Sequence, residues 1–137
     1  MRTRAPTRRR DRDAIVCFAL GVLLLGSAVW MLAAPLGWYS GVPADVPDFG
    51  PYNEHFVRDI GCAYLASAIA LLWGAAQPSR RLPLLAIVAV FLGAHGVLHV
   101  FDTSRGFVDP HHWWIDFPGV YLPALIVIVL AWRARRA

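Results

Sequence analysis

Long runs of apolar residues, separated by shorter polar segments, dominate the chain. A helix that rises about 1.5 Å per residue needs about 20 residues to cross about 30 Å of hydrocarbon. Four runs reach or approach that length, and the expected spans are about 14–34, 57–76, 82–101 and 117–132. The first contains no charged residue, and the third contains only histidines as ionisable groups. This pattern predicts an all-α fold, a four-helix transmembrane bundle.

The polar segments differ in charge, which predicts the orientation of the bundle. All 13 basic residues are arginines, and eleven of them lie in an arm at 1–13, the link at 77–81 and a tail at 133–137. The loops at 35–56 and 102–116, with the start of the second span, hold seven of the nine acidic residues. Positively charged segments stay in the cytoplasm. We therefore expect up-down topology in the cell membrane, with both termini cytoplasmic and both long loops outside.

Composition narrows the class of protein further. The chain is 58% hydrophobic and 16% charged, whereas a soluble domain averages about 45–50% apolar and about 25% charged residues. A nucleic-acid-binding arm would not precede 20 apolar residues, so no nucleic-acid partner is expected. Two cysteines exclude a disulfide-rich secreted scaffold. The first apolar run is long for a signal peptide, and we expect it to remain as part of a membrane domain at 14–132.

Polar side chains gather near the predicted outer side, where all five histidines lie. His95, His99 and Asp102 share one face of the third span, because they are spaced i, i+4 and i+7. His55 and Asp59 are spaced i and i+4 where the second span begins. Because the second span descends where the third rises, the two sets should reach similar depth. The candidate metal or polar cluster is His55, Asp59, His95, His99 and Asp102.

Three interpretations of this cluster remain open. Polar groups in a membrane need partners, so the cluster could be a structural network in which Asp59 orients a histidine and Glu54 holds Arg58. Imidazoles and carboxylates on facing helices also suit Zn, Cu or Fe. The third interpretation is a pocket for a quinone or a lipid headgroup, with Arg58 as anion anchor. The secondary candidates for the site are Glu54, His111, His112 and Asp116.

Aromatic residues accompany the histidines on the outer side. Trp38, Tyr39, Trp113 and Trp114 are typical of an interfacial belt at the level of the lipid headgroups. The first outer loop is rich in proline and long enough to pack over the bundle as part of a cap. The lipid bilayer is the expected partner, and the sequence leaves open membrane-protein partners or a homo-oligomer.

The segment Arg58-Asp-Ile-Gly61-Cys-Ala-Tyr64-Leu-Ala opens a helix rich in small residues. With four spans of these lengths, it resembles the DoxX-like small four-helix membrane proteins. The resemblance covers the spans broadly and one short motif, and it implies a four-helix bundle. Some of these proteins are linked to membrane redox complexes that pass electrons to quinone, which implies an association with redox chemistry. His95, His99 and Asp102 do not map onto that family.

The sequence therefore predicts a small multi-pass membrane protein with an outward-facing His/Asp/Arg pocket, redox-associated through a bound metal or quinone. The alternative is a non-catalytic subunit or scaffold whose polar cluster only locks helix packing. Whether the protein is an enzyme stays open.

Overall fold

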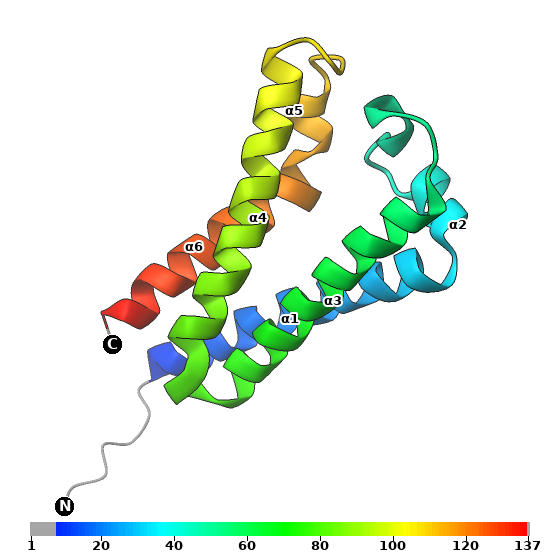
Figure 1. The fold of residues 1–137 in the computed structure, drawn as a ribbon. Helices are drawn as coiled ribbons and strands as arrows, with labels where there is room; N and C mark the ends of the chain where they lie inside the picture. The colour runs from blue at the N-terminus through cyan, green and yellow to red at the C-terminus, as the bar shows by residue number, and fades with distance from the viewer. Residues whose placement is uncertain (1–7, 137) are drawn as a thin grey trace, which may run out of the picture.

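The computed structural model describes residues 8–136, with side chains from Arg12 onward, and the regular elements in this part of the chain are all helical, without a strand. Residues 1–7 of the predicted arm lie outside the described residues. The elements are α1 (Arg8–Ala33), α2 (Pro35–Gly41), the 3-10 turn η1 (Val46–Phe49), α3 (Glu54–Ala76), the 3-10 turn η2 (Pro78–Arg80), α4 (Arg81–Ser104), α5 (His112–Ile115), the π-helical turn η3 (Phe117–Tyr121) and α6 (Leu122–Arg135) (Figure 1).

Four helical stretches are long and apolar enough to cross a membrane: Arg12–Ala33, Glu54–Ala76, Pro78–Ser104 and His112–Arg135. The prediction of an all-helical chain with four such helices is confirmed. The second begins three residues earlier than expected because the side chain of Asn53 caps it, accepting a hydrogen bond from the backbone N–H of Phe56 at 3.1 Å. The fourth begins five residues earlier because α5 and the turn η3, separated by a bend at Asp116, precede α6.

The helices form two pairs, α1 with α3 and α4 with α6, and α3 also packs against α4 (Figure 1). Two glycines bring α1 and α3 close together. A Cβ atom at Gly61 would lie 2.9 Å from Cβ of Met31, and one at Gly21 would lie 2.9 Å from Cγ of Leu72. Small residues at such contacts are how helices associate in lipid, where packing replaces the hydrophobic effect.

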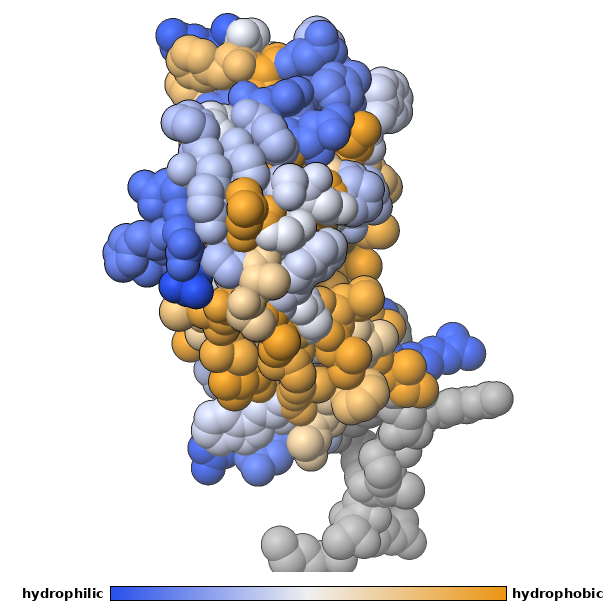
Figure 2. Space-filling view, turned by 90° about the vertical axis from the view of Figure 1, so that its right-hand side faces the viewer, coloured by the Kyte–Doolittle hydropathy of each residue, from blue (hydrophilic) through white to orange (hydrophobic). Residues whose placement is uncertain are grey.

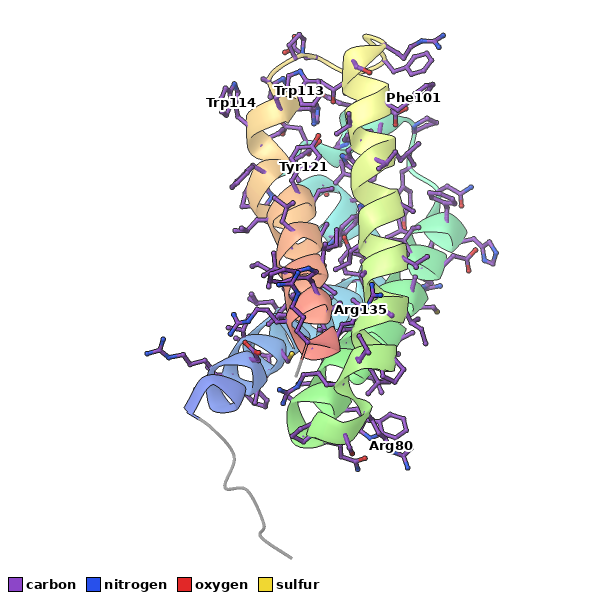
Figure 3. All side chains as sticks on the ribbon, turned by 90° about the vertical axis from the view of Figure 1, so that its left-hand side faces the viewer. Arg80, Phe101, Trp113, Trp114, Tyr121 and Arg135 are labelled. Atoms are coloured by element: carbon purple, nitrogen blue, oxygen red, sulfur yellow. The ribbon has the colours of Figure 1, made fainter. Side chains whose placement is uncertain are left out.

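The two ends of the molecule differ in character. Figure 1 places the N-terminal end of α1 and the C-terminal end of α6 at one end. We call the opposite end, which carries η1 and α5, the loop end. In Figure 3, Trp113 and Trp114 lie at the loop end and Arg80 at the other. Figure 2 shows a band of hydrophobic residues across the lower part of one face, between hydrophilic residues above and below.

Contacts of arginine hold the end opposite the loop end. Arg81 is buried, and its Nε donates to the carbonyl oxygen of Gly74 at 2.8 Å, which satisfies an acceptor in the last turn of α3. Arg133 of α6 pairs with Asp13 of α1 at 2.7 Å. These contacts join the two helix pairs at the end that is rich in arginine. The loop end, in contrast, holds nearly all the histidine and carboxylate side chains of the described residues.

Candidate functional site

A buried carboxylate between two imidazoles forms the centre of the loop end. Asp116 is 1% exposed, and its Oδ2 lies 2.7 Å from Nδ1 of His99. Its Oδ1 lies 3.3 Å from Nδ1 of His112, which is fully buried. A carboxylate accepts hydrogen bonds, so this arrangement suits imidazoles that both donate from Nδ1. Asp116 thus connects α4 with α5 through two hydrogen bonds.

Local backbone structure positions these groups. His99 lies in the penultimate turn of α4, and Thr103 donates its hydroxyl to the His99 carbonyl oxygen at 2.9 Å. His112 begins the single turn α5, so Asp116 follows it at i+4 on the same side of the turn. The backbone carbonyl of Asp116 then accepts the N–H groups of Val120, at 2.8 Å, and of Tyr121, at 3.3 Å. The wide turn η3 starts there, so Asp116 lies at the junction between α5 and the last span.

The first loop brings a second carboxylate and a ring to this centre. In η1, Asp48 places Oδ2 3.3 Å from Nε2 of His112. The ring centroid of Phe49 lies 4.7 Å from that of His99 and 4.8 Å from that of His112. Asp45, just before η1, has a positive φ of 43°, which aspartate tolerates better than most residues. The loop therefore covers the two imidazoles, as the prediction of a cap anticipated.

His111 completes the cluster on its exposed side. Its Nδ1 lies 2.9 Å from Oδ1 of Asp109, and its Nε2 lies 3.1 Å from Oδ2 of Asp45. The hydrogen bonds to Asp109 and then to Asp45 raise the pKa of His111 above its usual value. The pKa of Asp109 is lowered, first by the backbone N–H of His111 and then by its imidazole. His111 is thus held by carboxylates from both outer loops.

Three side chains of this cluster have the composition and spacing of a metal site. We call Asp48, His111 and His112 the loop-end triad; one ligand atom from each lies within 4.8 Å of the others. Two atoms bound to a tetrahedral ion at about 2.0–2.1 Å lie about 3.3–3.4 Å apart. The 3.3 Å between Nε2 of His112 and Oδ2 of Asp48 matches that separation. Only His111 must move closer for all three to reach one ion.

The structure brings together some of the residues predicted from the third span. The rings of His95 and His99 meet edge to face with centroids 4.6 Å apart, and Phe91 and Tyr64 lie beside His95. Asp102 follows on α4, but within residues 12–136 its carboxylate forms no hydrogen bond or ion pair with these histidines. The partner of His99 is Asp116, which the sequence analysis ranked as a secondary candidate.

The residues predicted from the second span form two separate surface pairs. His55 lies 3.4 Å from Asp59, with side chains 89% and 60% exposed. Glu54 pairs with Arg58 at 2.6 Å, and Nε of Arg58 donates to the Leu32 carbonyl oxygen at 3.4 Å. The interpretation in which Glu54 holds Arg58 agrees with this geometry. The expected cluster across two helices does not form, because these pairs lie exposed on α3 whereas the acid that His99 contacts comes from the second loop.

Sequence reasoning missed the contribution of the first loop. Asp45, Asp48 and Phe49 were not among the candidates. The available signal was a pair of aspartates around Pro47 in a loop stiffened by Pro43 and Pro51. That pattern predicts a rigid loop with two carboxylates, but it does not predict which element the loop contacts.

The four predicted belt residues divide between two environments. Trp38 donates its Nε1–H to the hydroxyl of Ser27 at 3.2 Å, and Tyr39 donates its hydroxyl to the Gly50 carbonyl oxygen at 2.7 Å. These two side chains fasten the first loop. Trp113 and Trp114 are exposed, Trp114 by 80%, and lie at the loop end (Figure 3).

Comparison with known proteins found no counterpart: no family model, no curated protein and no solved structure matches this chain. The DoxX-like resemblance therefore stays a prediction, and the function is argued from the site alone.

Proposed function

We propose that this chain is a four-span membrane protein that binds a divalent transition-metal ion at the loop-end triad. The observation that carries the proposal is the convergence of three ligand atoms within 4.8 Å of one another, from two loops that are about 60 residues apart in sequence. A carboxylate with two imidazoles is a usual ligand set for such ions, and it leaves a position for water or a substrate.

We further propose that the bundle is up-down, that both termini are cytoplasmic, and that the triad faces outward from the cell membrane. The distribution of arginine supports this orientation. Arg80 lies at the end opposite Trp113 and Trp114 (Figure 3), Arg81 follows it in the chain, and Arg133 pairs with Asp13 near the start of α1. The positive end of a membrane protein stays inside. The site would then meet ions supplied from outside the cell.

The ligand set suits Zn, Cu or Fe, and a redox association, as the DoxX-like resemblance implies, requires Cu or Fe. A quinone or headgroup pocket anchored by Arg58 has less support. Arg58 already pairs with Glu54, and its side chain is about half exposed on α3, apart from the histidines.

A specific observation favours the alternative of a non-catalytic scaffold. Both ring nitrogens of His111 and of His112 already face carboxylate oxygens without a metal ion. Two of these four contacts, from His111 to Asp45 and from His112 to Asp48, would be enough to fasten the first loop to the second and give the loop end one shape. In that case, the exposed tryptophans beside it would meet a membrane-protein partner or a second copy.

Metal titration of the chelator-treated protein separates the two functions. We would titrate Zn²⁺, Cu²⁺ and Fe²⁺ into protein in lipid nanodiscs by calorimetry, with anaerobic handling for Fe²⁺. If the chain binds a metal ion, we expect one ion per chain in the wild type. His112→Ala should abolish this binding, and Asp48→Asn should weaken the affinity at least 10-fold. His55→Ala is the matched control, since it removes an exposed histidine from the same end. Absence of binding in the wild type would contradict the metal site and support the scaffold.

A further inference from the structure

Asp116 is the most deeply buried carboxylate at the loop end, and the loop-end triad does not include it. Both of its oxygens are occupied, one by Nδ1 of His99 and one by Nδ1 of His112. Its carboxylate faces Nδ1 of His112, whereas Asp48, whose side chain is 46% exposed, faces Nε2 of the same ring. Asp116 lies behind the site and contacts it only through His112.

The contact to Asp116 selects which nitrogen of His112 is available to a metal. A carboxylate accepts but does not donate, so Nδ1 of His112 must carry a hydrogen in this arrangement. Nε2 is then the ring nitrogen left for a metal ion, and an ion at the triad would replace any hydrogen that Nε2 shares with Oδ2 of Asp48, 3.3 Å away. Metal-bound histidines in proteins commonly donate their other N–H to a carboxylate, which fixes the ring and raises its basicity as a ligand.

His99 and Phe49 also restrict the orientation of the His112 ring. His99 acts through the Asp116 carboxylate, and Phe49 acts through direct ring packing. His99 holds Oδ2 of Asp116 at 2.7 Å, so the carboxylate cannot turn away from His112 without losing its shorter hydrogen bond. The ring of Phe49 packs on both imidazoles, at centroid distances of 4.7 and 4.8 Å. The ring plane of His112 is thus constrained by a hydrogen bond and by packing.

We infer that Asp116 is the positioning residue of the metal site, holding His112 as the Nδ1–H tautomer with Nε2 directed at the ion, and that His99 keeps Asp116 in place. The inference rests on the proposed function. It also assigns a role to His99, which lies on a helix long and apolar enough to cross a membrane and is not one of the three clustered ligands.

Asp116→Asn is the sharpest variant because it preserves shape. The amide offers one acceptor and one donor, so it cannot accept from His99 and His112 together. We expect its oxygen to keep the shorter contact, to His99 at 2.7 Å, so that its nitrogen faces Nδ1 of His112 at the longer 3.3 Å and that ring gives up its Nδ1–H. His99→Asn is the complementary variant, since the amide nitrogen of Asn occupies the place of Nδ1 and still donates. His99→Ala removes that donor altogether.

Asp59→Asn is the matched control. His55 and Asp59 repeat the i, i+4 pairing of His112 and Asp116 on α3, but both are exposed and contact no member of the triad. The same chemical change there should alter neither metal affinity nor the His112 ring.

The experiment combines ¹⁵N NMR of the histidine rings in metal-free protein with Zn²⁺ titration by calorimetry. In the wild type, we expect the Nδ1–H signal of His112. Asp116→Asn should lose that signal and bind Zn²⁺ about 10–100-fold more weakly. His99→Ala should also weaken binding, His99→Asn should restore it, and Asp59→Asn should behave as the wild type.

Each outcome decides one claim. A wild type that binds no Zn²⁺ overturns the proposed function. Wild-type binding that is unchanged in folded Asp116→Asn, or a wild-type His112 without a proton on Nδ1, overturns the positioning role alone. If Asp116→Asn fails to fold, the His99→Ala and His99→Asn pair decides, because equal Zn²⁺ affinity in both variants would contradict the inference.

Discussion

Two histidine–aspartate pairs in this protein have the same spacing along the chain and opposite surroundings. His55 and Asp59 lie 3.4 Å apart on α3, with side chains 89% and 60% exposed. His112 and Asp116 lie 3.3 Å apart across α5, with side chains 0% and 1% exposed. The exposed pair has water as an alternative partner, whereas the buried pair depends on His99, Asp48 and Phe49. A shared motif thus becomes a site only where other elements enclose it.

Removal of the imidazole from each pair should give the largest contrast. His112→Ala leaves Asp116 buried with one partner fewer and opens a cavity, so we expect a loss of about 3–5 kcal/mol in the free energy of unfolding. His55→Ala should change it by less than about 0.5 kcal/mol. Denaturant titration in detergent measures both. Equal losses would show that the burial of His112 has no energetic consequence.

Metal addition should stabilise the protein through the buried pair only. An ion that binds the folded state alone adds about 2.7 kcal/mol when its free concentration is 100 times the dissociation constant. We expect this gain from Zn²⁺ in the wild type and in His55→Ala, and its absence in His112→Ala. Thermal unfolding with and without Zn²⁺ measures it. A gain that persisted in His112→Ala would place the ion elsewhere.

The docking of the first loop onto His111 should depend on pH. The pKa of His111 is raised by Asp109 and Asp45, so its contribution is complete below about 6.5 and is lost as pH rises through the higher folded value. The pKa of Asp109 is lowered, so its contribution is lost as pH falls through a value below about 3.9.

Loop docking should therefore be tightest between about pH 4 and about 6.5. Hydrogen exchange of residues 42–52 across this range measures it. Asp48 of the same loop also contacts His112, so His111→Gln is the variant that isolates the effect of His111. A wild-type profile that matched His111→Gln would contradict the assignment.

The smallest effect is expected at the second exposed pair on α3. Glu54 and Arg58 are each about half exposed, and such pairs contribute about 0.2–1 kcal/mol. Glu54→Gln should reduce the free energy of unfolding within that range and leave Zn²⁺ affinity unchanged. A loss of Zn²⁺ binding in Glu54→Gln would instead connect α3 to the site and favour the cluster predicted from sequence.

The helices were predictable because their signal is local. Each span is a run of apolar residues, and a run such as 82–101 defines its own length without knowledge of its neighbours. The first residues of the second and fourth spans were less predictable, because a side-chain cap and a short preceding helix also determine where a span begins. The cap at Asn53 extended α3, and α5 with the turn η3 extended the fourth span toward the loop end.

The site was predictable only in part because its signal is not local. The i, i+4 rule paired His95 with His99 and His55 with Asp59, and those neighbours do meet. It also applies to His112 and Asp116, but spacing alone contains no measure of burial that would rank this pair above the exposed one. The contacts of Asp45 and Asp48 depend on how a proline-rich loop folds back, which no spacing rule describes.

X-ray absorption spectroscopy of the Zn²⁺-loaded protein tests the central claim most directly, since it identifies the atoms bound to the ion. We expect a shell of nitrogen and oxygen at about 2.0–2.1 Å with the multiple-scattering signal of two imidazoles, and no sulfur. That signal should fall to one imidazole in His111→Gln. A sulfur neighbour at about 2.3 Å, from Cys17 or Cys62, or the absence of bound Zn²⁺, would contradict the account.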